Sequence, residues 1–111
     1  MAHLGNGFEH RWGERFRVNI PVRVSAAALA RVDACMKNLS LSGALMKSDC
    51  DLRLHTLIEV RIELPPPSPR VAVIKAHVAR KLKEGVGIEW CEFAPSIVKD
   101  LLRSPAVRLP P

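Results

Sequence analysis

Apolar and polar residues alternate along much of this 111-residue chain, and this period of two constrains its fold more than any other feature. Residues 18–25 read Val-Asn-Ile-Pro-Val-Arg-Val-Ser, and residues 58–64 read Ile-Glu-Val-Arg-Ile-Glu-Leu. Successive side chains of a β-strand point to opposite faces, so each segment predicts a strand with one apolar face. Pro21 cannot donate a ladder hydrogen bond, so we expect it at a sheet edge or at a non-bonding position.

The remaining segments complete an all-β pattern. A polar turn at Asn38–Gly43 joins two predicted strands into a hairpin, a proline-rich connection follows residue 64, and the polar stretch Arg80–Glu84 predicts another turn. Six strands joined by such turns indicate an antiparallel sheet that closes into a barrel or folds into a sandwich. The four further predicted strands cover residues 29–37, 44–47, 72–78 and 86–90.

The pattern changes near the C-terminus. Pro95 suits the first turn of a helix, and the apolar residues after it form one stripe at helical spacing. A helix of two to three turns is not stable alone in water, so it should pack against the barrel. Ser104 and Pro105 end it, and the tail to Pro111 is expected to be loose. The stripe consists of Ile97, Val98, Leu101 and Leu102.

Composition narrows the classes of function. Seventeen Lys and Arg against eleven Asp and Glu give a net charge of +6, which favours an anionic partner: a nucleotide, a nucleic acid or a membrane surface. Three cysteines without a C-x-x-C pair and four scattered histidines predict neither disulfides nor a metal site. The apolar runs are too short to cross a bilayer, and no signal peptide is recognisable, so we expect a cytoplasmic protein.

A cationic segment precedes the first strand. Residues 10–18 read His-Arg-Trp-Gly-Glu-Arg-Phe-Arg-Val, with Arg11, Arg15 and Arg17 within seven positions. A guanidinium group is planar and permanently charged, so it can bind a phosphate or the O6 and N7 edge of guanine through two hydrogen bonds. Trp12 can stack on a base or pack on the barrel, and the sequence leaves both alternatives open.

The turn of the first hairpin carries a second polar group of residues. It reads Asn-Leu-Ser-Leu-Ser-Gly from Asn38 to Gly43. The amide of Asn38 can recognise a purine edge, and the hydroxyl of Ser40 can bind a phosphate or an amide. Gly43 can take a positive φ or let a ligand lie close to the backbone. These residues must also form an ordinary hairpin turn.

Together these motifs resemble the PilZ domain. The shared features are an R-x-x-x-R arm at Arg11 and Arg15, a strand reading V-x-I-P-V-x-V, the motif N-x-S-x-x-G from Asn38, and a late G-V-G-I-E-W strand. The resemblance extends from about Arg11 to the helix near Arg103. It implies a bacterial six-stranded antiparallel β-barrel with a short C-terminal α-helix, whose ligand is the second messenger cyclic di-GMP.

The resemblance also assigns the binding residues. Arg11 and Arg15 are expected to hold guanine edges and phosphates, while Asn38, Ser40 and Gly43 form the surface beneath the ligand. Additional contacts are expected from residues next to these motifs, and Arg17 could replace Arg15. No catalytic residue, metal or cofactor other than the ligand is implied. The additional contacts are His10, Trp12, Arg17 and Ser42.

This assignment divides the chain into three parts. Residues 1–16 form a flexible N-terminal arm that carries R-x-x-x-R, residues 17–103 form the PilZ barrel with its helix, and residues 104–111 form a tail. We expect no output domain, so a receptor of this kind would order its arm on the ligand and signal to an unidentified effector protein by contact.

Two alternative functions compete with this one. A ligand-independent PilZ-like protein adaptor would keep the fold, but such proteins usually have eroded motifs. A small RNA-binding β-barrel would fit the basic charge, but it generally needs aromatic stacking platforms, and this chain has no Tyr, three Phe and two Trp. We expect no enzymatic activity, because the motif spacing assembles no nucleophile and base, no carboxylate pair and no metal cluster.

Overall fold

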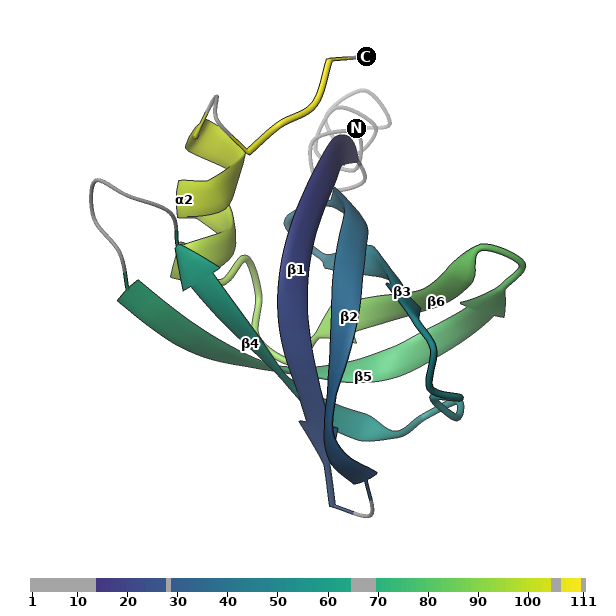
Figure 1. Ribbon diagram of the computed structural model, residues 1–111. Helices are drawn as coiled ribbons and strands as arrows, with labels where there is room; N and C mark the ends of the chain where they lie inside the picture. Colours follow the sequence, from purple (N-terminus) through teal and green to yellow (C-terminus); the bar gives the residue numbers. More distant parts are fainter. Residues whose placement is uncertain (1–13, 28, 65–69, 105–106, 111) are drawn as a thin grey trace, which may run out of the picture.

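The computed structural model describes residues 14–27, 29–64, 70–104 and 107–110. Six strands form a closed barrel in the order β1-β2-β3-β6-β5-β4, and all neighbours are antiparallel (Figure 1). The predicted six-stranded antiparallel barrel with a short C-terminal helix is therefore confirmed. The elements are β1 (Phe16–Ala26), β2 (Leu29–Leu39), β3 (Gly43–Ser48), β4 (Leu57–Leu64), β5 (Arg70–Leu82), β6 (Gly85–Trp90) and α2 (Ser96–Arg103).

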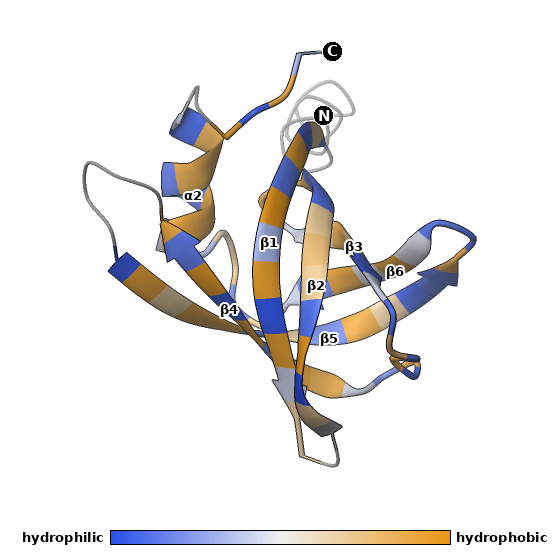
Figure 2. Cartoon of the chain, in the orientation of Figure 1, coloured by the Kyte–Doolittle hydropathy of each residue, from blue (hydrophilic) through white to orange (hydrophobic). Residues whose placement is uncertain are grey.

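The alternation in the sequence becomes the inside and outside of the barrel. Along β4 buried residues alternate with exposed ones, and β1 shows the same pattern as alternating bands of hydropathy (Figure 2). Apolar rows from all six strands meet in one core, where their burial provides the main driving force for folding. Its largest fully buried side chains are Met36, Leu39, Met46, Leu52, Ile62, Ile88 and Leu101.

Pro21 lies where its missing N–H is not needed. The ladder between β1 and β4 pairs Val22 with Ile62 and ends at Ser25 opposite Glu59, so Pro21 precedes it. On its other side Pro21 is opposite Cys35 of β2. In a closed barrel β1 is not an edge strand, so the proline occupies a non-bonding position, which is one of the two alternatives that its residue type allows.

The hairpin of β5 and β6 is longer than the sequence pattern predicts. The polar stretch Arg80–Glu84 predicts a turn, but Arg80, Lys81 and Leu82 continue β5 and pair with Gly87, Val86 and Gly85. All three side chains in β5 are exposed. The β5 side of this end has no buried face, so the alternation that reveals a strand is absent from Arg80 to Leu82.

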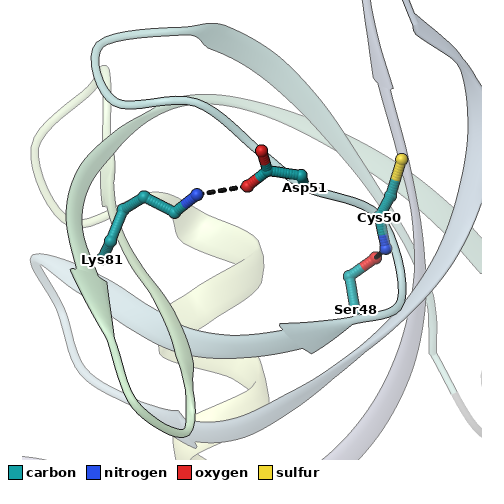
Figure 3. Close-up of polar contacts among 4 residues, drawn as sticks. All are labelled: Ser48, Cys50, Asp51 and Lys81. Atoms are coloured by element: carbon teal, nitrogen blue, oxygen red, sulfur yellow. Dashed lines mark hydrogen bonds and ion pairs between the residues drawn. The ribbon is translucent and has the colours of Figure 1, made fainter.

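The connection between β3 and β4 is attached to β5. The carboxylate of Asp51 pairs with the ammonium of Lys81, and the N–H of Cys50 donates to the hydroxyl of Ser48 (Figure 3). Leu52 is buried in the core, and the N–H of His55 donates to the carbonyl of Val78 at 2.7 Å. Position 81 of β5 therefore carries a cation with an acidic partner.

The helix and the C-terminal segment cover one end of the barrel (Figure 1). Ile97, Val98 and Leu101 of α2 are buried in the common core, as the apolar stripe predicts. The expectation of a loose tail is wrong for Val107–Leu109: Arg108 forms a β-bridge with Val18, and the N–H of Leu109 donates to the carbonyl of Arg17 at 2.8 Å. These backbone contacts with β1 are long-range and leave no local pattern in the sequence.

No helix in the described part of the chain is both long enough and apolar enough to span a bilayer.

Candidate ligand-binding site

Arg15 of the first motif meets the second motif on the outer surface of the barrel. Arg15 lies immediately before β1, and its Nη1 donates to Oδ1 of Asn38 at 2.8 Å. The antiparallel ladder produces this contact, because it places Arg17 opposite Asn38 and thereby brings the end of β2 beside the start of β1. Arg17 is exposed on the same surface. The predicted ligand residues Arg11, His10 and Trp12 lie outside the described residues.

Asn38 lies in β2 and not in the turn. An irregularity in the β2–β3 register between Met36 and Asn38 turns its side chain toward β3, and Oδ1 also accepts a hydrogen bond from the N–H of Leu45 at 3.0 Å. Both interactions use the amide oxygen, so the amide nitrogen faces away from these donors. It has no hydrogen-bond partner among the residues that the structure describes, and it can donate to an acceptor on a ligand.

Ser40 is the structural centre of the turn. Its side chain is fully buried, its Oγ accepts hydrogen bonds from the N–H groups of Ser42 and Gly43 at 3.3 and 3.2 Å, and it contacts the carbonyl of Gly43 and Oγ of Ser42 at 3.2 and 3.1 Å. The N–H of Ser40 donates to the carbonyl of Gly43 at 2.9 Å. Ser40 therefore fixes the turn from inside, and the exposed Ser42 presents a hydroxyl at the surface.

Trp90 supports the turn from β6. Its indole Nε1 donates to the carbonyl of Ser40 at 3.2 Å, and its backbone N–H donates to the carbonyl of Ser42 at 3.0 Å. The side chain is 6% exposed, as expected for a core residue, but the sequence pattern does not indicate its polar contacts with the turn. A carbonyl left without this buried donor would lose a hydrogen bond that water cannot easily replace.

Gly43 is required by strand packing. Its φ is not positive, but a Cβ atom added here would lie 1.9 Å from the carbonyl oxygen of Ile88 in β6. The sequence suggested that Gly43 lets a ligand lie close to the backbone, but the backbone of β6 occupies the space beside this glycine. A ligand role for Gly43 depends on its backbone alone.

Arg80 is a neighbour of this surface that the sequence motifs do not indicate. Its side chain lies over Gly87, where an added Cβ would be 3.4 Å from Arg80 Nε. Burial makes the larger contribution to lowering the pKa of Arg15, and repulsion from the Arg80 guanidinium lowers this pKa further. Within the described residues, neither Arg15 nor Arg80 forms an ion pair with a carboxylate. The surface thus combines Arg15, Arg17 and Arg80 with the amide nitrogen of Asn38.

These donors are suited to anions and to the acceptor edges of purines. Guanidinium N–H groups bind phosphate oxygens or guanine O6 and N7, and an amide N–H can donate to either. Among the described residues, no three His, Cys, Asp or Glu side chains are gathered in a way that could hold a metal ion.

Comparisons with known proteins identify the family and the fold. The family model described as PilZ domain matches residues 9–104. The crystal structure of the PilZ domain of CeSA from a cellulose-synthesizing bacterium is 20% identical, with a TM-score of 0.65, over 81% of this chain and 99% of that one, which shows a shared fold. No curated protein matches the chain significantly. Because the family model covers both motifs, all six strands and the helix, the chain belongs to the PilZ domain family.

Proposed function

We propose that this protein is a cytoplasmic bacterial receptor for cyclic di-GMP and has no catalytic activity. The observation that carries the proposal is the hydrogen bond of 2.8 Å between Arg15 and Asn38, which joins the two motifs of a cyclic di-GMP-binding family at one surface. Cyclic di-GMP has two phosphate charges and two guanines, and the guanidinium and amide donors of this surface are complementary to both.

The N-terminal arm completes the site in this proposal. Arg11 precedes Arg15 by four residues, so a ligand bound by Arg15 and Asn38 would give the arm a second anchor. Binding then orders the arm, and the surface formed by arm and ligand is recognised by an effector protein. The free energy of ordering comes from the arginine contacts with the ligand.

Titration calorimetry with cyclic di-GMP tests the binding. We expect Arg15→Ala to lose about thirtyfold in affinity, because a charge-assisted contact contributes roughly 2 kcal/mol. Arg23→Ala is the matched control: it removes the same charge from the outer face of β1, where Arg23 pairs with Asp33 at 3.7 Å. Equal weakening by both variants would indicate a general charge effect, and a wild-type protein that releases no heat would refute the receptor.

The same titration separates the alternatives. A ligand-independent adaptor would bind no cyclic di-GMP and would keep its partner when Arg15 is replaced. An RNA-binding barrel would bind oligonucleotides with a steep salt dependence and would not respond to the dinucleotide. The Arg15–Asn38 contact favours the receptor, since both alternatives leave this pairing of motifs without a role.

Ordering of the arm has its own readout. The protein has two tryptophans: Trp12 lies in the arm, and Trp90 is buried below the turn. We expect cyclic di-GMP to change the tryptophan fluorescence of the wild type and to leave that of Trp12→Phe almost unchanged. A ligand that binds without any change from Trp12 would contradict the ordering of the arm at this position.

A further inference from the structure

Arg80 lies at the end of a row of residues that begins beside Arg15. The strand registers place Arg17 opposite Asn38, Asn38 opposite Leu45, Leu45 opposite Gly87, and Gly87 opposite Arg80. Directly opposed residues of antiparallel strands share a face of the sheet. The row therefore crosses five strands of the outer surface, from β1 to β5.

The middle of this row, Leu45 and Gly87, carries no charged side chain, and its two ends, Arg17 and Arg80, are cationic. Gly87 has no side chain, and the Arg80 side chain extends across it, with Nε and Nη2 at 3.4 and 3.7 Å from where a Cβ would be. Leu45 is half-buried and offers an apolar surface beside it. A flat purine can lie over Leu45 beside this guanidinium, because the missing side chain of Gly87 lets the Arg80 side chain lie close to the sheet.

Arg80 lacks the carboxylate partner that Arg70 and Lys81 of the same strand have. Its neighbour Lys81 pairs with Asp51, and Arg70 of β5 pairs with Asp100 of α2. Arg80 forms no such pair within the described part of the chain, and repulsion from its charge contributes to the lowered pKa of Arg15. Two like charges that face one low surface repel each other in the free protein, and an anion between them removes that repulsion.

We propose that Arg80 is a third ligand-binding arginine, which donates to a phosphodiester of the cyclic dinucleotide lying over Leu45 between Arg15 and Arg80. This inference rests on the proposed receptor function and extends its site from the β2–β3 turn to β5. It assigns the ligand a direction across the barrel: one guanine or phosphate is held at Asn38 and Arg15, and the other half of the molecule reaches Arg80.

Replacement of Arg80 tests the proposal by calorimetry with cyclic di-GMP. We expect Arg80→Ala to bind about tenfold more weakly or worse, and Arg80→Lys to recover part of the loss, since it restores the charge without the planar pair of donors. The matched control is Arg61→Ala, which removes an exposed arginine from the neighbouring strand β4, outside the row. It should bind within about twofold of the wild type.

Stability without ligand distinguishes a binding role from a structural one. Removal of Arg80 should leave the midpoint of urea unfolding unchanged or raise it slightly, because a like charge near Arg15 disappears. If Arg80→Ala lowers the free energy of unfolding by as much as it lowers the free energy of binding, the inference is overturned. Arg80→Lys repeats the test with a side chain of similar length.

The outcomes separate this inference from the receptor function. Binding that is weakened by Arg15→Ala but unchanged by Arg80→Ala supports the receptor and overturns the role of Arg80. A wild-type protein that does not bind cyclic di-GMP overturns both. Weakening by Arg80→Ala and not by Arg61→Ala supports both.

Discussion

The turn between β2 and β3 and the arginine pair Arg15 and Arg80 lie on the same side of the barrel, yet their polar groups are used in opposite ways. In the turn, the N–H, the carbonyl and the hydroxyl of Ser40 each have a partner within the protein. The two guanidinium groups face each other's charge, and neither has a carboxylate partner in the described residues. Hydrogen bonds saturated in this way stabilise a fold, whereas unmatched charges are available to a ligand.

Asn38 connects the two regions. Its Oδ1 accepts from the N–H of Leu45, which belongs to the barrel, and from Arg15, which belongs to the cationic surface. The amide nitrogen on the opposite side has no partner among the described residues and is available to a ligand. One residue of the motif thus orients an arginine and can contact a ligand, while Ser40 and Gly43 determine the shape of the backbone that holds it.

Replacement of Gly43 should have the largest effect on stability. A Cβ in Gly43→Ala would lie 1.9 Å from the Ile88 carbonyl oxygen, so β3 and β6 must separate. We expect a loss of about 3 kcal/mol in the free energy of unfolding, measured with urea, because overpacking against backbone cannot be relieved by a rotamer change.

Gly87→Ala is the control for this prediction. Its Cβ would meet the flexible side chain of Arg80 at 3.4 Å, and this side chain can move. The unfolding free energy should therefore change by less than about 1 kcal/mol. Equal losses in the two variants would contradict the view that Gly43 serves the strand contact.

The paired replacements Ser40→Ala and Ser42→Ala sharpen the comparison within the turn. Ser40→Ala leaves the N–H groups of Ser42 and Gly43 without their acceptor, so we expect it to lower the unfolding free energy by about 2 kcal/mol. Ser42 is exposed, and its removal should change stability by less than about 0.5 kcal/mol. Chemical denaturation of both variants without ligand measures the difference.

The binding results of this pair carry separate information. If Ser40 acts through the shape of the turn, Ser40→Ala should weaken cyclic di-GMP binding together with stability. A Ser40→Ala protein of normal stability that no longer binds would instead show that its hydroxyl contacts the ligand directly, and the assignment of Ser40 to the turn would be wrong.

The sequence predicts those parts of the molecule that depend on local patterns. Alternation indicates β1 and β4 most clearly, because buried and exposed residues alternate along both, and turn signals help to indicate the other strands. The two motifs predict that Arg15 and Asn38 share one surface, and the hydrogen bond between them agrees with this. The family resemblance, confirmed by the match over residues 9–104, supplies the closure into a barrel.

Contacts between distant segments are what the sequence does not reveal. The end of β5 has no alternation, so its pattern predicts a turn at Arg80. The approach of Arg80 to Arg15 depends on the register of five strands. The bridge between Arg108 and Val18 also joins segments 90 positions apart by backbone groups, which every residue possesses. Patterns of side chains carry no information on such a pairing.

The smallest predicted effect concerns the ion pair of Asp51 and Lys81. Lys81 is a cation of β5 that is paired with a carboxylate, in contrast to Arg80. A hydrogen bond from Lys81, then its charge, lower the pKa of Asp51 below its ordinary value of 3.8. A carboxyl with a lowered pKa in the folded state contributes stability above its unfolded value, and this contribution is lost as the pH falls through the folded value. The difference in thermal midpoint between the wild type and Asp51→Asn should therefore be small at neutral pH, because the pair is exposed, and should vanish in acid below pH 3.8. A difference that persists at lower pH would show that Asp51 stabilises this loop through something other than its carboxylate charge.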